Sequence, residues 1–457
     1  MYDIVVVGGG PGGYAAALYA HNFGLSVALI ERDRLGGTCL LRGCIPAKAL
    51  IQSGEVYATV KGSAEFGVVT DDPTFDWSVA MARKTKVVEG LVSGLGGLLK
   101  SRGVEIIDGV GSLGGEHTVV VTHGDGSTTE VEARAIILAT GSSPATIPGY
   151  AFDGTMIVSS DHALSWDSQP DRVAVIGAGV IGCEFASFLA EVGTEVHLFE
   201  LEDQLVPGME PEAAKVLERA FRRRGVVMHL GVGVGRPTVD SNVVVVPFGD
   251  DSVEVDVVLV AVGRQPQTAG INLEAVGLTT DRGYVEVDPA TMRTTADQVY
   301  AVGDIVAGTP QLAHVAFAEA IAAVTHIATG EVAPVNYHAV PMVVYTHPEI
   351  AWVGHTEAAA RTDGYRVSTS DHGMRGVGRA IIQGETGGMV KIVSEVDGQL
   401  LGATVAGPGA GEMIHELMYT VGFEALPDEA AAFIHAHPTI SEAIGEALMA
   451  SAGRNLH

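Results

Sequence analysis

The sequence predicts an α/β protein built from two doubly wound units and a C-terminal α+β domain. Two glycine-rich turns carry this prediction, the first after an apolar run that includes Val5 and the second after one that starts at Val173. Each turn is followed by a helical stretch and then by another apolar run, which is typical of buried parallel strands. From about residue 336 strand-like runs alternate with helices and no such turn recurs. The first two regions therefore represent an internal duplication of a βαβ unit.

The first unit carries the pattern Gly8-x-Gly10-x-x-Gly13 between a predicted strand and a predicted helix. In a Rossmann-like unit these glycines allow a tight turn, and the pyrophosphate of a dinucleotide binds at the N-terminus of the helix. The next apolar run ends at Glu31, 18 positions after Gly13. A carboxylate at this position accepts hydrogen bonds from a ribose. The first unit is therefore predicted to bind a dinucleotide.

The second unit repeats the arrangement with Gly177-x-Gly179-x-x-Gly182 and Glu200, again 18 positions after the third glycine. A single fingerprint gives false positives readily, whereas two copies with matched carboxylates argue against coincidence. Residues 201–204 read Leu-Glu-Asp-Gln, without the arginine that would accommodate a 2′-phosphate. The second site is therefore predicted to bind NAD(H) rather than NADP(H).

Each unit also contains a later strand that ends in glycine. These strands are the runs 135–141, with Thr140 and Gly141 at the end, and 257–263, which ends at Gly263. A third run, 299–304, ends in Gly303-Asp304 and precedes a helical stretch from about 311 to 328.

Two cysteines follow the first fingerprint, in the run Gly-Gly-Thr-Cys39-x4-Cys44-Ile-Pro-Ala-Lys48. A close pair in a chain with three cysteines is catalytic or metal-binding rather than part of a disulfide framework. A zinc site would need a second pair or histidines at ligand spacing, and none accompanies this pair. We therefore predict no metal and a redox-active dithiol. Cys183 stands alone in an apolar helix and is expected to pack.

The net charge is −28, from 27 basic and 55 acidic side chains. Such a chain would be repelled by nucleic acid phosphates. The charge suits either a basic protein partner or simply a solvated acidic surface. No apolar stretch reaches the length of a membrane span, and the chain enters a strand at once without a signal-peptide pattern. We expect a cytoplasmic protein.

The chain resembles the dihydrolipoamide dehydrogenases of the pyridine nucleotide-disulfide oxidoreductase family almost from end to end. Beside the cysteine run, the resemblance rests on Tyr-Thr-His-Pro-Glu (345–349), Gly-Pro-Gly-Ala-Gly-Glu-Met-Ile (407–414) and His-Ala-His-Pro-Thr-Ile-Ser-Glu (435–442). The last two blocks separate these enzymes from sister reductases better than the cysteine run does. One departure is Leu41, where many relatives have asparagine.

The resemblance implies a role for each of several residues. Cys39 would be the interchange thiol that meets substrate, and Cys44 would contact the flavin. Lys48 would lie near the flavin and pair with Glu184, and His437 with Glu442 would form the acid–base unit. Together with the fingerprints, the resemblance implies FAD contacts from Gly8, Gly10, Gly13, Glu31, Lys48, Thr140, Gly141, Asp304 and Ala313, and NAD contacts from Gly177, Gly179, Gly182, Glu200 and Gly263. His314, His347 and His435 are expected to be structural.

The resemblance also implies a domain plan and partners. The expected domains are FAD-binding (1–149), NAD-binding (150–266), a central segment that completes the FAD domain (267–335), and an interface or dimerisation domain (336–457). The implied activity is oxidation of protein-bound dihydrolipoamide with NAD⁺ as acceptor, in a homodimer. Its partners would be lipoyl domains and the acyltransferase core of a 2-oxoacid dehydrogenase complex, or the glycine-cleavage carrier protein.

Two other interpretations stay open at this point. One is another NAD(P)H-dependent disulfide reductase of the same family. Mercuric and large thioredoxin reductases have an extra C-terminal redox pair, which the cysteine-free segment after Cys183 does not supply, and glutathione reductase prefers NADPH, against Glu200. The other is a redox-silent flavoprotein binding subunit, which does not account for the intact cysteine pair.

Overall fold

In the computed structural model, which describes residues 1–454 and 456, the chain divides into two compact units. The first comprises Met1–Leu50, Ser78–Ala145 and Arg264–Val335. The second comprises Ile51–Trp77, Thr146–Gly263 and the chain from Asn336 onward. The division falls within helix α3 (Cys44–Gly62) and at the first residue of helix α4 (Trp77–Ser101).

The first unit is organised around β6 (Thr128–Leu138), a strand shared by two sheets. Its C-terminal half pairs in parallel with β1 (Tyr2–Val7) and β19 (Val299–Ala301), and β1 leads on to β2 (Val27–Glu31) and β3 (Glu105–Asp108). Its N-terminal half pairs antiparallel with β5 (Thr118–Thr122), which pairs with β4 (Val110–Gly115). The parallel part has the strand order of a doubly wound fold.

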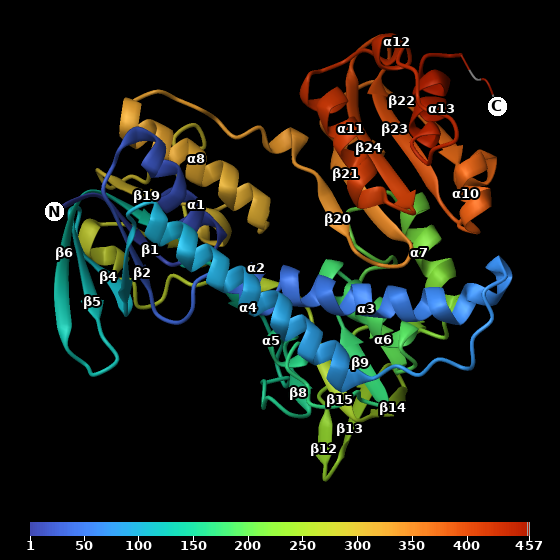
Figure 1. Ribbon diagram of the computed structural model, residues 1–457, viewed down its shortest axis with the longest axis horizontal. Helices are drawn as coiled ribbons and strands as arrows, with labels where there is room; N and C mark the ends of the chain where they lie inside the picture. Colours follow the sequence, from blue (N-terminus) through green and yellow to red (C-terminus); the bar gives the residue numbers. More distant parts are fainter. Residues whose placement is uncertain (455, 457) are drawn as a thin grey trace. The chain divides into compact units, whose positions relative to one another are not determined.

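Side chains of β1 alternate between two cores, as expected for a strand buried on both faces. Ile4 and Val6 pack with alanines of α1 (Pro11–Ala20) and α8 (Ala313–Thr329). Val5 and Val7 pack with Leu113 and its neighbours from the antiparallel sheet. Helices α1 and α8 lie side by side in Figure 1. The other elements of this unit are α2 (Gly37–Arg42), β7 (Ser142–Pro144), β16 (Arg264–Pro266), β17 (Thr280–Asp281) and β18 (Tyr284–Val285).

The second unit contains a five-stranded parallel sheet in the order β11 (Val227–His229), β10 (Glu195–Phe199), β9 (Arg172–Ile176), β15 (Val257–Val260) and β8 (Ile157–Val158). The antiparallel strands β12 (Thr238–Asp240), β13 (Val243–Phe248) and β14 (Asp251–Val255) form a separate sheet whose buried residues share a core with β9, β10 and β15. The associated helices are α5 (Ser160–Ala163), α6 (Val180–Glu191) and α7 (Pro211–Arg223).

The same unit also holds the C-terminal antiparallel sheet, in the order β20 (Met342–Val344), β21 (Glu349–Gly354), β24 (Leu400–Gly407), β23 (Met389–Glu395) and β22 (Val367–Gly373). Every residue of the central strand β24 is buried. Helix α11 (Ala410–Gly422) packs on β21 and β24, and α13 (Glu442–Ser451) packs on β22 and β23 (Figure 1). The remaining helices are α9 (Glu357–Thr362), α10 (Gly378–Gln383) and α12 (Pro427–Ala430).

The predicted fold class is confirmed: two parallel sheets of the dinucleotide-binding type are accompanied by a C-terminal α+β domain. Both strands end before the glycines that were predicted to end them, since β6 ends at Leu138 and β15 at Val260. Among the described residues, no helix combines the length and the apolar character that a membrane span requires.

Candidate active site

The first fingerprint forms a turn between β1 and α1 in which Gly8 and Gly13 leave no room for a side chain. Gly8 has φ +107°, and a Cβ on it would lie 2.3 Å from the carbonyl oxygen of Ala139. A Cβ on Gly13 would lie 1.8 Å from the carbonyl oxygen of Gly8. At Gly10, the residue before the first helical position, a Cβ would meet only Gly37 Cα at 3.7 Å. The N-terminus of α1 is therefore open to a phosphate, which its backbone N–H groups and dipole favour.

Glu31, the last residue of β2, is hydrogen-bonded to this turn. Its Oε2 accepts a hydrogen bond from the Gly9 N–H at 2.6 Å, and its Oε1 accepts one from the Asp33 N–H at 2.9 Å. The two backbone donors fix the carboxylate beside the glycine turn. A ribose bound there would find a preorganised acceptor.

The second fingerprint reproduces this geometry. A Cβ on Gly177 would lie 2.6 Å from the Ala261 carbonyl oxygen, and one on Gly182 would lie 1.8 Å from the Gly177 carbonyl oxygen. Around Gly179 no heavy atom lies within 4 Å of such a Cβ. Both turns therefore fit a dinucleotide in the same way.

The acidic residue of the second fingerprint is held as in the first. The Glu200 carboxylate accepts hydrogen bonds from the Ala178 N–H at 2.8 Å and the Glu202 N–H at 3.1 Å. Gly263 stands after β15 with φ +121° and open space around it.

The two cysteines lie close together on consecutive helices. Cys39 is in α2 and Cys44 is the first residue of α3, and no disulfide joins them in this structure. The hydrogen bond with Cys44, burial and the negative charge that Cys44 carries when ionised raise the pKa of the Cys39 thiol, while the Lys48 charge acts in the opposite direction. A thiol that reacts as a thiolate needs a lowered pKa, whereas the pKa of Cys39 is raised. The physical reason is that two adjacent sulfurs cannot both ionise readily.

Lys48 and Glu184 lie in different units, and their pairing stays a prediction. Lys48 is one helical turn after Cys44 in α3. Glu184 is in α6, 4% exposed, and its Oε1 accepts a hydrogen bond from the Tyr345 N–H at 3.1 Å. A buried, hydrogen-bonded carboxylate is not an ordinary charge on a helix surface.

A polar chain that the sequence did not predict lies beside the dithiol, in the first unit. Arg264 donates hydrogen bonds to Thr38 Oγ1 at 3.2 Å and to Ser142 Oγ at 2.7 Å. Ser142 in turn donates to the Asp304 carboxylate, so Asp304 is linked to the residue that precedes Cys39. Arg264 and Ser142 each directly follow a strand-end glycine, and this shared position is the signal that could have identified them.

Other predicted FAD-site residues lie near these hydrogen-bonded side chains. Thr140 Oγ1 donates to the Gln267 carbonyl oxygen at 2.6 Å, and the Gln267 N–H donates to the Gly141 carbonyl oxygen at 2.8 Å. Gly141 has φ +71°. Asp304 lies in a short 3₁₀ turn (Gly303–Ile305), and Ala313 is the first residue of α8.

His437 and Glu442 form the predicted pair within the second unit. His437 Nδ1 lies 2.8 Å from Glu442 Oε1, and Glu442 Oε2 accepts a hydrogen bond from the Thr439 N–H at 2.9 Å. The hydrogen bond from His437 and that from Thr439 lower the pKa of Glu442. The His437 side chain is 78% exposed, which leaves Nε2 accessible for proton transfer. His435 instead pairs with Glu416 at 2.7 Å and is mostly buried.

Two dinucleotide sites and a dithiol in one chain define a class of protein, the oxidoreductases that pass electrons between a thiol pair and a nucleotide. The family model described as pyridine nucleotide-disulphide oxidoreductase matches residues 2–320, and that of the family's dimerisation domain matches residues 340–448. The chain belongs to the pyridine nucleotide-disulphide oxidoreductase family.

Its relatives include dihydrolipoyl dehydrogenases. The chain is 40% identical to dihydrolipoyl dehydrogenase 3 of Pseudomonas putida, over 98% of this chain and 97% of the relative. It is also 40% identical to dihydrolipoyl dehydrogenase of Haloferax volcanii, over 100% and 97% of the two chains. Among solved structures, LpdA from Mycobacterium tuberculosis matches with a TM-score of 0.91 and 31% identity, over 98% of this chain and 99% of that one.

Proposed function

We propose that the protein is a dihydrolipoyl dehydrogenase, which oxidises protein-bound dihydrolipoamide to lipoamide and reduces NAD⁺. The observation that carries this proposal is the Cys39–Cys44 pair directly beside one of two matched dinucleotide turns. The 40% identity to dihydrolipoyl dehydrogenases over almost the whole chain supports the choice of substrate.

The first turn is assigned to FAD and the second to NAD(H). The FAD residues are Gly8, Gly10, Gly13, Glu31, Lys48, Thr140, Gly141, Asp304 and Ala313, and the NAD residues are Gly177, Gly179, Gly182, Glu200 and Gly263. When bound, FAD would supply the flavin, an electron carrier between the dithiol and NAD⁺. The acidic residues at positions 202 and 203, close to Glu200, disfavour the 2′-phosphate of NADP(H).

The protein's own residues perform the thiol chemistry. His437 accepts a proton at Nε2 from the substrate dithiol, while Glu442 holds Nδ1 and stabilises the charged ring. The substrate thiolate attacks Cys39 in the oxidised Cys39–Cys44 disulfide, and Cys44 leaves as a thiolate. The second substrate sulfur then displaces Cys39, which closes the lipoamide disulfide. The substrate loses two electrons and the cysteine pair gains them.

Lys48 and Glu184 are assigned to the electrostatics of the reducible end of the flavin. A cation held there by a carboxylate would favour the negative charge that develops on reduction.

The C-terminal region, which matches the dimerisation domain of the family, supports a homodimer. As partners we infer lipoyl domains and the acyltransferase core of a 2-oxoacid dehydrogenase complex, or the glycine-cleavage carrier protein. The domain boundaries at 149, 266 and 335 and the cytoplasmic location stay predictions.

An anaerobic absorbance titration of the FAD-loaded protein tests the function. Dihydrolipoamide and NADH should each reduce the flavin, and NADPH at equal concentration should do so far less. Reduction by NADPH but not by dihydrolipoamide would instead favour another disulfide reductase of the family. Reduction by no thiol or nucleotide would favour a redox-silent subunit.

A further inference from the structure

The segment 201–210 follows the carboxylate of the second fingerprint and joins β10 to α7 without regular structure. Val206, in its middle, has φ +48° and is 3% exposed. A β-branched side chain rarely adopts this left-handed conformation. Such a conformation persists only where the surrounding structure holds it. The middle of the segment therefore depends on contacts that hold Val206 in this conformation.

The middle of the segment is bonded to the fingerprint turn. The Val206 N–H donates to the carbonyl oxygen of Ala178 at 2.8 Å. The N–H of the same Ala178 donates to Glu200 Oε2 at 2.8 Å. Leu205 and Met209 are buried beside this contact. A shift of the segment would consequently move the turn and the ribose-binding carboxylate.

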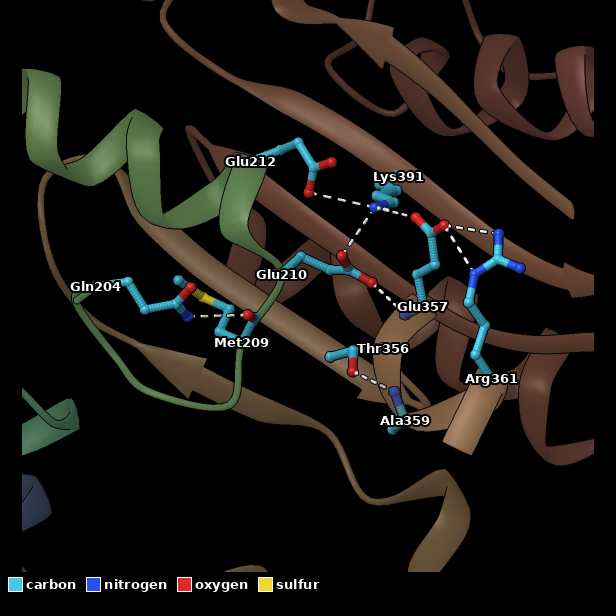
Figure 2. A network of polar contacts seen from close by, with 9 residues as sticks. All are labelled: Gln204, Met209, Glu210, Glu212, Thr356, Glu357, Ala359, Arg361 and Lys391. Carbon is cyan, nitrogen blue, oxygen red and sulfur yellow. Dashed lines mark hydrogen bonds and ion pairs between the residues drawn. The ribbon is translucent and has the colours of Figure 1, made fainter. Parts of the chain in front are cut away.

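The far end of the segment is anchored by the buried carboxylate of Glu210. Its Oε2 accepts a hydrogen bond from Lys391 Nζ at 2.8 Å, and its Oε1 accepts one from the Glu357 N–H at 2.6 Å. Figure 2 shows these contacts converging on Glu210 at the end of the loop that carries Gln204 and Met209. The Glu210 side chain is 2% exposed, so water does not stabilise its charge.

Lys391 comes from β23 of the C-terminal sheet and is itself buried. Its ammonium also contacts Glu357 Oε2 at 3.0 Å and the half-exposed Glu212 at 3.2 Å (Figure 2). Burial alone would lower the pKa of Lys391, but its hydrogen bonds to Glu210, Glu357 and Glu212 raise it. The ammonium is therefore a permanent cation at this position.

Removal of that cation would leave a buried carboxylate without a charged partner. Such a group is strongly unfavourable and must become hydrated or protonated. Because Glu210 ends the segment directly before Pro211 of α7, movement of its side chain toward water would displace the end of the segment.

We propose that Lys391 is a positioning residue for the nicotinamide dinucleotide: through Glu210 it anchors segment 201–210, and so holds Glu200 and the second turn in their binding geometry. This inference rests on the assignment of the second fingerprint to NAD(H). It gives a strand within the family's dimerisation domain a part in nucleotide affinity.

The test compares FAD-loaded wild type with Lys391→Met, which keeps the length of the side chain and removes its charge. Equilibrium titration with NADH should show a Kd raised about tenfold or more in the variant. Hydrogen exchange of the amides in 201–209 should be faster in the variant without nucleotide. The rate of flavin reduction by dihydrolipoamide, measured without NAD⁺, should be unchanged.

Three further variants separate positioning from general damage. Glu210→Gln combined with Lys391→Met removes both charges, and it should recover most of the NADH affinity. Glu212→Gln, at the half-exposed partner of the same ammonium, should bind NADH within about twofold of wild type, because exposed pairs contribute little. Should Lys391→Met fail to fold, Glu210→Gln alone weakens the same anchor and should raise the Kd about threefold.

Unchanged NADH binding in a folded Lys391→Met protein would overturn the inference. An equal loss of reduction by dihydrolipoamide, or no recovery in the double variant, would also overturn it. If wild type itself does not bind NADH, the assignment of the second fingerprint fails, and this inference fails with it. Tight binding by wild type and variant alike would refute only the role of Lys391.

Discussion

At the scale of single residues, the dithiol acts as a coupled pair rather than as two independent cysteines. The hydrogen bond with Cys44, burial and the charge of an ionised Cys44 all raise the pKa of Cys39, so the two sulfurs do not both ionise readily. The sequence predicted both cysteines and the carboxylates Glu31 and Glu200. It did not predict the direction of the Cys39 shift, because that direction depends on the distance between the two sulfurs and on burial.

We expect single substitutions to separate the two sulfurs. In FAD-loaded Cys39→Ser, Cys44 remains beside the flavin, and a long-wavelength absorbance band should appear without reductant. Cys44→Ser should lack this band, because Cys39 is assigned to the substrate side. Absorbance spectra at several pH values provide the measurement. Indistinguishable spectra for the two variants would show that the roles are wrongly assigned.

A second residue-scale prediction concerns His347, which lies 3.7 Å from the Glu191 carboxylate. The Glu191 carboxylate raises the pKa of His347 above its ordinary value, and the nearby Arg224 charge opposes this shift. A raised folded-state pKa adds stability below the unfolded pKa, and this stability is lost as pH rises through the folded value. The thermal midpoint of wild type should therefore exceed that of His347→Gln more at pH 6 than at pH 8.5. A difference that does not change with pH would contradict the pairing.

At the scale of elements, the two fingerprint turns show which structural features a local sequence pattern can predict. The glycine positions and the 18-residue spacing could be predicted from the sequence because each βαβ turn requires them locally. The sequence could not explain why position 8 must be glycine, because the atom that excludes a Cβ there belongs to Ala139, far along the chain. The long helices α3 and α4 and the antiparallel β4–β5 pair were not predicted either, since their packing depends on distant segments.

Gly179 gives a prediction that separates folding from binding. No heavy atom lies within 4 Å of a Cβ built there, so Gly179→Ala should fold and lose about 1 kcal/mol or less. The added methyl would occupy the space at the N-terminus of α6 that is assigned to the pyrophosphate. NADH affinity, followed by titration, should therefore fall sharply while the thermal midpoint changes little. Gly193 lies in a turn after α6 with φ +99°, which strains any other residue. Gly193→Ala should therefore lower the thermal midpoint while NADH affinity changes little.

At the scale of the whole molecule, the match to a dimerisation domain explains why large apolar side chains are exposed in the C-terminal region. Phe433 is 77% exposed and Ile434 is 98% exposed, directly before His435. Exposed apolar side chains of this size are typical of interfaces. The sequence predicted an interface domain by resemblance. It did not predict the Lys391–Glu210 contact, because a lysine in a strand pattern does not reveal which carboxylate it will meet.

We predict that His437 of one chain serves the dithiol of the other in a homodimer. Cys39→Ser and His437→Ala homodimers should both be inactive in dihydrolipoamide oxidation. A mixed dimer would have one site with both intact groups and one site with both lesions. Co-refolding with FAD should therefore restore activity, measured on mixed dimers isolated by two different tags. Inactive mixed dimers would place His437 and Cys39 of the same chain in one site.

The shared strand β6 also has a consequence for how the protein is made on the ribosome. Its C-terminal half needs β19 as a neighbour, and β19 is translated about 160 residues later. Meanwhile the whole parallel sheet of the second unit, from β8 to β15, has already emerged. The second dinucleotide unit can thus fold on the nascent chain while the first still has an open edge. Stable capture of the first cofactor must therefore await the late return of the chain, which makes flavin loading a closing step of biosynthesis.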